Sequence, residues 1–153
     1  MVALDADDES GNDVVVSIFR QVNNAYISQQ VVIDVTPVND AAIASSSIEF
    51  DSDASGKITF NADTFGLDDP DGEVSGIKIK ITDLSGVTGG AILKFDDGSG
   101  ASDVNVGDEI SYTDISKLTL NHDNSAVFTF DFRVIDDLGL ENTTDYTVTL
   151  DVL

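Results

Sequence analysis

The chain has 153 residues, of which 29 are acidic and 7 are basic, so its net charge is −22. Such a surface repels nucleic acid and anionic membrane, and we expect neither as a partner. The absence of cysteine excludes disulfides, thiolate zinc sites and cysteine nucleophiles. A hydrophobic content of 41% is enough for a folded core. No stretch approaches the ~20 apolar residues that a membrane-spanning helix needs, so direct membrane insertion is not expected.

The acidic residues are mostly aspartate: 24 are Asp and 5 are Glu. Aspartate favours turns over helices and is the short carboxylate that calcium-binding loops use. We expect most of these side chains to keep the protein soluble and a few of them to bind metal.

The first predicted strands follow an acidic loop over residues 5–12. Residues 14–20 and 25–35 have the composition of strands, and Asn23 and Asn24 between them signal a turn. An isolated hairpin is marginally stable in water. This hairpin is therefore expected either to pack on the rest of the chain or to be the remnant of a truncated neighbour.

Period-two alternation recurs through the remainder of the chain, bounded by Gly, Asp, Asn and Ser. It predicts one helical turn within residues 61–67 and short strands over residues 47–50, 57–60, 77–81, 91–95, 110–113, 118–121, 127–135 and 146–152. Many short strands with one buried face and one wet face, separated by turns, predict an all-β fold: a β-sandwich with antiparallel sheets.

Two of these strands have the clearest patterns. In residues 77–81, isoleucines alternate with lysines, so one face is buried and the other is wet. In residues 127–135, one face carries three phenylalanines and a valine, which are Phe128, Phe130, Phe132 and Val134. Burying each phenylalanine contributes on the order of 2 kcal/mol. Residues 127–135 are therefore predicted to form the central strand of the core.

A junction is predicted within residues 35–40. Pro37 cannot donate to a sheet ladder and ends the preceding strand, after which Asn39 and Asp40 offer side-chain oxygens. An ordinary exit from a strand into a turn accounts for the same residues, and their spacing alone does not decide between the two interpretations.

An internal repeat favours the junction. Residues 146–152 echo residues 29–35, and each stretch follows a loop with two consecutive aspartates. The sequence thus predicts that residues 1–36 are the closing hairpin of a partial preceding repeat, residues 37–40 a linker, and residues 41–153 a complete repeat.

The string Val-Thr-Pro-Val-Asn-Asp-Ala-Ala at residues 35–42 resembles the repeat junction of bacterial cadherin-like domains, which occur in large surface adhesins and in some secreted polysaccharide-active proteins. Residues 107–122 also resemble a stretch of the related chondroitin-sulfate-proteoglycan-type repeat, with Leu120 where that family often has an aromatic residue. The resemblance covers residues 41–153 and, in part, residues 1–40. It implies a Greek-key β-sandwich of cadherin or Ig-like type, at the bacterial cell surface or outside the cell.

The same resemblance implies calcium at the junction between repeats. The implied ligands come from three places in the chain: the linker pair Asn39 and Asp40, the Asp-x-Asp of Asp69 and Asp71, and Asp136 at the start of the last hairpin. Calcium prefers six to eight oxygen ligands, several of them carboxylates held by loops. For each residue the alternative is a solvated aspartate or asparagine that forms a turn.

Residues typical of catalysis are few. His122 is the single histidine, and no Gly-x-Ser-x-Gly sequence accompanies it. No glycine-rich phosphate loop precedes a helical pattern. The acidic residues lie in polar loops, whereas acid–base catalysis needs a carboxyl in an apolar pocket. We therefore expect a non-enzymatic protein.

The predicted function is a calcium-binding adhesin repeat that acts in adhesion and as a spacer between neighbouring repeats of its chain, with a cell-surface glycan or protein as a further partner. The alternative is a carbohydrate-binding accessory module of a secreted polysaccharide-active protein. That module would need an exposed aromatic side chain, and the chain has three tyrosines and no tryptophan.

Overall fold

The computed structural model describes residues 14–33, 38–51, 56–72, 74–123 and 126–152. The chain forms two compact units, residues 1–39 and residues 40–153. The predicted acidic loop over residues 5–12 and Pro37 of the predicted linker lie outside the described residues.

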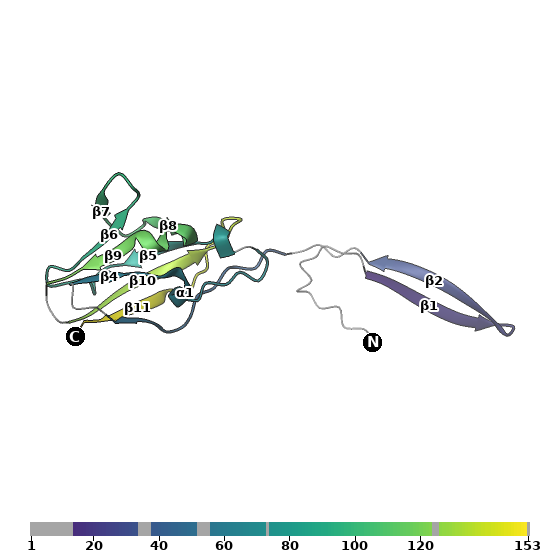
Figure 1. Cartoon of the computed structure of the whole chain (residues 1–153). Coiled ribbons are helices and arrows are strands. Elements are labelled where there is room, and N and C mark those ends of the chain that lie inside the picture. Colours follow the sequence, from purple (N-terminus) through teal and green to yellow (C-terminus); the bar gives the residue numbers. More distant parts are fainter. Residues whose placement is uncertain (1–13, 34–37, 52–55, 73, 124–125, 153) are drawn as a thin grey trace. The chain divides into compact units, whose positions relative to one another are not determined.

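The smaller unit contains a single described hairpin (Figure 1). Strands β1 (Val14–Val22) and β2 (Ala25–Ile33) pair antiparallel over their whole length. Asn23 and Asn24 between them have positive φ angles of 49° and 63°. A two-residue turn with both φ angles positive matches the twist of the flanking strands, and Asn tolerates this conformation. The predicted hairpin and its Asn-Asn turn are confirmed.

The larger unit has a sheet of five strands and a sheet of four (Figure 1). The five-stranded sheet has the spatial order β3 (Ile48–Asp51), β11 (Tyr146–Asp151), β10 (Val127–Ile135), β5 (Lys78–Asp83) and β8 (Glu109–Ser111). The four-stranded sheet has the order β4 (Lys57–Thr59), β9 (Leu118–Asn121), β6 (Ile92–Asp96) and β7 (Ala101–Asp103). In the described part of this unit, three short helices connect strands: α1 (Ala62–Phe65), η1 (Val74–Gly76) and η2 (Tyr112–Lys117).

Strand β10 lies at the centre of the five-stranded sheet, between β11 and β5, as its pattern predicts. Its inward side chains Phe128, Phe130, Phe132 and Val134 are at most 2% exposed. They belong to one hydrophobic core with side chains of the other sheet, such as Ile58, Leu93 and Leu120. The fold is therefore all-β and sandwich-like.

The outward face of β5, which is next to β10, is polar. Lys78 pairs with Glu109 at 3.2 Å, and Lys80 pairs with Glu141 at 2.7 Å. The isoleucines that alternate with these lysines, Ile77, Ile79 and Ile81, are fully buried. The prediction of one buried and one wet face for residues 77–81 is confirmed.

Three features of the larger unit differ from the predicted strands. Strand β3 pairs with β11 in parallel, so the five-stranded sheet is not wholly antiparallel. Strand β7 was not predicted, because residues 101–103 are short and exposed and carry no alternating pattern. Tyr112 and Thr113 lie in η2 rather than in a strand. The ion pair between Asp114 and Lys117 at 2.7 Å, with the acid near the start of the turn and the base at its end, favours the helical conformation there.

Replacing Phe132 with alanine should lower the free energy of unfolding by about 3–5 kcal/mol, because it empties part of a packed core. Urea denaturation measures the change. Val127 lies on the same strand but is 60% exposed, so Val127→Ala should change the free energy of unfolding by less than about 0.5 kcal/mol. Equal effects of the two substitutions would contradict the assignment of β10 to the centre of the core.

Candidate functional site

One side of the candidate site is formed by a short antiparallel bridge between Ile43 and Asp68. The Ile43 N–H donates to the Asp68 carbonyl at 2.8 Å, and the Asp68 N–H donates to the Ile43 carbonyl at 3.0 Å. Continued by three residues, this antiparallel register places Asp40 opposite Asp71. The Asp40 N–H indeed donates to Asp71 Oδ2. The bridge therefore ties the first residue of the larger unit to a loop about thirty residues later in the chain.

That loop, residues 68–72, turns around the side chain of Asp69. The Asp71 N–H donates to Asp69 Oδ1 at 3.1 Å, which is the turn-forming contact expected of an aspartate two residues earlier. Asp69 is only 7% exposed. Asp69 Oδ2 and Asp71 Oδ1 are buried and have no hydrogen-bond partner among the described residues. Two carboxylate oxygens are thus removed from water without a donor in the described part of the chain.

A second acidic turn follows β10. Asp136 is 2% exposed, and its Oδ1 accepts a hydrogen bond from the Leu140 N–H at 2.7 Å. Its own N–H donates to the Leu140 carbonyl at 3.1 Å. Gly139 has a φ angle of 91°, which glycine adopts without strain. Buried β10 therefore ends in a turn whose first residue is a buried carboxylate.

Two glycines allow this turn to approach the 68–72 loop closely. A Cβ atom on Gly72 would lie 2.8 Å from Asp69 Oδ2 and 3.0 Å from Asp137 Oδ1. A Cβ atom on Gly76 would lie 2.4 Å from the Cβ of Asp137. A side chain at Gly76 would therefore overlap Asp137, and one at Gly72 would displace two carboxylate groups. These glycines were not predicted to belong to the site, although two glycines close to an Asp-rich loop were a signal for close backbone approach.

We call Asp69, Asp71, Asp136 and Asp137 the acidic pole. Burial raises the pKa of Asp69, and the nearby charges of Asp136, Asp137 and Asp71 raise it further, against the lowering effect of the Asp71 N–H donor. Burial and the neighbouring carboxylates therefore both disfavour the ionised form of Asp69.

Four of the predicted ligand residues meet here. Asp69, Asp71 and Asp136 contribute carboxylates to the acidic pole, and Asp40 joins through its backbone, with its side chain exposed. Asn39 falls in the other compact unit, so its place relative to the acidic pole stays a prediction.

The donor chemistry suits a hard divalent cation. Carboxylate oxygens are the ligands that calcium and magnesium prefer, and the two partnerless buried oxygens of Asp69 and Asp71 are of this kind. Within the ranges that the structure describes, no three His, Cys, Asp or Glu side chains are already arranged as a metal site. The fit to a cation thus rests on the two buried oxygens and the surrounding negative charge.

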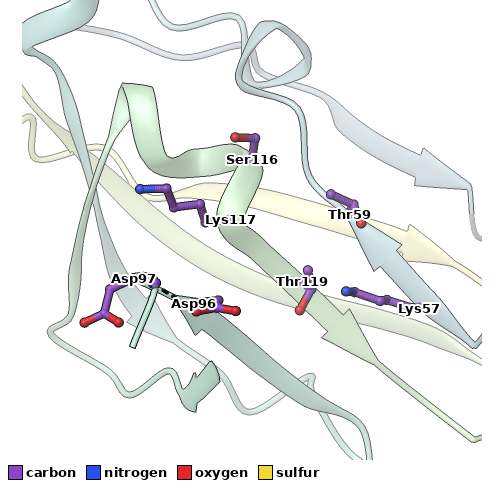
Figure 2. Close-up of a pocket in the computed structure, with 8 residues that line it drawn as sticks. Lys57, Thr59, Asp96, Asp97, Ser116, Lys117 and Thr119 are labelled. Atoms are coloured by element: carbon purple, nitrogen blue, oxygen red, sulfur yellow. Dashed lines mark hydrogen bonds between the residues drawn. The ribbon is translucent and has the colours of Figure 1, made fainter. Parts of the chain in front are cut away.

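A polar groove of about 410 Å³ lies over the four-stranded sheet (Figure 2). Lys57 of β4, Lys117 of η2 and the turn after β6 form its walls. The lining residues are Lys57, Thr59, Asp96, Asp97, Gly98, Ser116, Lys117 and Thr119. None of these residues is aromatic, so the groove offers no surface on which a sugar ring stacks.

The three tyrosines and the histidine occupy different environments. Tyr146 stacks on Phe132 with ring centroids 5.7 Å apart, and the Tyr112 hydroxyl donates to Asp63 at 3.4 Å. Tyr26 on the hairpin is 73% exposed. His122 is buried, with its ring centroid 6.0 Å from that of Phe128. His122 therefore packs beside the core residue Phe128.

No family model, no curated protein and no solved structure matches this chain. Among the helices in the described part of the chain, none is long and apolar enough to cross a membrane.

Asp69→Asn should stabilise the metal-free protein at neutral pH. A carboxyl whose pKa is raised by folding contributes stability at low pH, and that contribution is lost as pH rises through the raised pKa. The neutral amide avoids this loss and keeps the Oδ1 acceptor for Asp71. Melting temperatures in EDTA at pH 7 and below pH 4 measure the effect. The melting temperature of the variant should be higher than that of the parent at pH 7, and this difference should shrink below pH 4. A lower melting temperature of the variant at pH 7 would contradict this account.

Gly76→Ala should lower the free energy of unfolding by about 1–3 kcal/mol, because its new Cβ overlaps Asp137 and must displace the turn after β10. Ser75 lies beside Gly76 in η1 and is exposed, so Ser75→Ala is the matched control and should change stability little. Chemical denaturation of both variants measures this difference. Equal free energies of unfolding in the two variants would show that stability does not depend on the close approach of Gly76 to Asp137.

Proposed function

We propose that residues 40–153 form a non-enzymatic, calcium-binding repeat of a bacterial cell-surface or secreted adhesin. The repeat is a Greek-key sandwich of cadherin-like type, and it acts in adhesion and as a spacer between neighbouring repeats. The all-β sandwich-like fold and the junction string at residues 35–42 support this proposal.

The observation that carries the proposal is the pair of buried, partnerless oxygens, Asp69 Oδ2 and Asp71 Oδ1, among the other carboxylates of the acidic pole. Burying an ionised carboxylate is costly unless a cation or several donors compensate it. A divalent cation supplies both the charge and the missing contacts. Calcium is favoured over magnesium because it accepts irregular sets of loop oxygens, whereas magnesium demands near-octahedral geometry.

The chain's own residues indicate what the cation would do. The Asp40 N–H is held by Asp71, and Asp71 in turn binds Asp69 through its backbone. The Asp136–Asp137 turn lies against the same loop through Gly72 and Gly76. A cation at the acidic pole would therefore fasten the entry of the larger unit to two of its loops. Removing that cation would restore the repulsion and loosen the entry segment.

The proposal includes no catalytic step. His122, the chain's single histidine, is buried, and its Nε2 has no hydrogen-bond partner among the described residues. Its ring packs against Phe128, and no serine or cysteine nucleophile motif accompanies it in the sequence.

Calcium should raise the melting temperature. With a dissociation constant of ~1 mM, which is typical of extracellular modules, 10 mM calcium stabilises a folded domain by about 1.4 kcal/mol. For a domain of this size that corresponds to a rise of about 5 °C. Thermal melting with EDTA, with calcium, and with sodium chloride at matched ionic strength measures it. A melting temperature that calcium leaves unchanged would overturn the calcium proposal.

The variant Asp71→Asn should abolish the calcium-dependent rise, because it removes one of the buried carboxylates. Asp96→Asn is the matched control. It makes the same charge change in an exposed turn where Asp96 Oδ1 accepts from the Gly98 N–H, a contact that asparagine preserves. The control should keep the rise. Equal loss in both variants would assign the effect to general screening of negative charge.

The alternative, a carbohydrate-binding module, finds support only in the polar groove beside Lys57 and Lys117. Affinity gels containing neutral or acidic polysaccharides distinguish it from the spacer. Retardation that Lys57→Ala relieves would favour carbohydrate binding, whereas unretarded migration in all gels would favour the spacer.

A further inference from the structure

Hairpin β1–β2 differs from the rest of the chain in charge. Residues 14–33 contain none of the 29 acidic residues and a single charged side chain, Arg20. Strand β2 carries no charge at all, and its residues 25–32 are all exposed. In a chain with a net charge of −22, this is a surface on which a second copy can approach without local repulsion.

The sequence of β2 also lacks the features that protect edge strands. Natural edge strands are commonly blunted by lysine, proline or a bulge. Neither strand contains lysine or proline, and the register runs without a shift from Val14↔Ile33 to Val22↔Ala25. A two-stranded hairpin is marginally stable, whereas three or more strands with an apolar face are stable. Pairing with another strand therefore gives the outward N–H and C=O groups hydrogen-bond partners and stabilises the hairpin.

The turn determines which backbone groups of β2 point away from β1. A two-residue turn closes on a hydrogen-bonded pair, here Val22 and Ala25. Pairs then alternate along the ladder, so the odd-numbered residues of β2 bind β1. The N–H and C=O groups of the even-numbered residues point outward: Tyr26, Ser28, Gln30 and Val32.

The sequence of β2, AYISQQVVI, is self-complementary about Gln29. In antiparallel pairing with a second β2, Tyr26 faces Val32, Ile27 faces Val31, and Ser28 faces Gln30. Apolar side chains thus meet apolar ones, and polar side chains meet at the centre. The outward-pointing even-numbered residues pair with one another in this register, as an antiparallel ladder requires. Aromatic–β-branched pairs are among those that stabilise sheets.

We propose that β2 is a homodimerisation edge: two copies of the chain pair through their β2 strands, antiparallel about Gln29, to form one four-stranded sheet. The interaction is two-fold symmetric, since each strand is both donor and acceptor. One strand pair buries less than the roughly 1,200 Å² of a standard interface, so the dimer is weak and depends on protein concentration. Raising the salt concentration strengthens it by screening the acidic remainder of the two chains.

Disulfide trapping tests the register. The chain lacks cysteine, so a single introduced thiol reports one contact. In the proposed dimer Gln29 faces its own copy in a non-hydrogen-bonded pair, whose Cα separation of about 4.5 Å suits a disulfide. Gln29→Cys should form a covalent dimer at least about tenfold faster than Ile18→Cys under mild oxidation. Ile18 is the matched control, because it pairs with Gln29 across the hairpin and would lie on the outer strand. Equal rates in the two variants would overturn the proposal.

Sedimentation of the full chain tests the edge without a covalent bond. The parent should dimerise with rising concentration and more strongly at about 300 mM than at about 20 mM salt. Gln30→Pro removes a central outward N–H and should weaken the dimer at least about tenfold, while its mirror, Ser17→Pro on the β1 edge, should not. A parent that stays monomeric throughout, or a dimer that survives Gln30→Pro or is lost equally in both variants, would overturn the proposal.

Discussion

The packing of β10 into the core is the interaction on which both the fold and the candidate site depend. Its inward phenylalanines belong to the core that both sheets share, and its two neighbours, β11 and β5, complete the centre of the larger sheet. The strand ends at Ile135, which is itself buried, and the next residue is Asp136. A carboxylate directly after a buried strand is held by the core and cannot move freely into water. The core thus determines where the acidic pole lies.

Charged side chains of the larger unit occur in two kinds of environment. On the outer face of the five-stranded sheet, cations and carboxylates are interleaved: Arg133 binds Asp145 at 2.8 Å, beside the pair of Lys80 and Glu141. Such exposed pairs contribute little stability individually, but they keep negative charge from accumulating. At the acidic pole, the groups that act on Asp69 are other carboxylates and a backbone N–H. Carboxylates crowded in this way are stabilised when a cation supplies the missing positive charge.

The hairpin shows the opposite composition. The side chains of the β1–β2 ladder are apolar or uncharged polar except for Arg20, and β2 contains no lysine, proline or bulge. Edges of this kind are normally a liability, because they pair with any available strand. In an acidic protein, the charge of the remaining chain limits such pairing to geometries that keep the acidic parts apart. A weak, symmetric pairing of β2 is consistent with an uncharged strand that favours pairing and acidic remaining parts that oppose it.

The sequence by itself determined most of the local structure. Period-two alternation identified the inward face of β10, the alternation of Ile and Lys identified both faces of β5, and Asn23-Asn24 identified the hairpin turn. These predictions succeeded because side-chain periodicity and turn conformation depend on neighbours in the chain. The Asp-rich loops were recognisable as turns for the same reason.

Only the tertiary structure decided which segments meet. The parallel pairing of β3 with β11, the register of the Ile43–Asp68 bridge and the approach of Asp137 to Gly72 and Gly76 join residues far apart in the chain. No local pattern encodes such contacts, because they follow from how two sheets close around one core. The candidate ligands could therefore be named from the sequence, but their convergence and the two glycines that permit it required the packed fold.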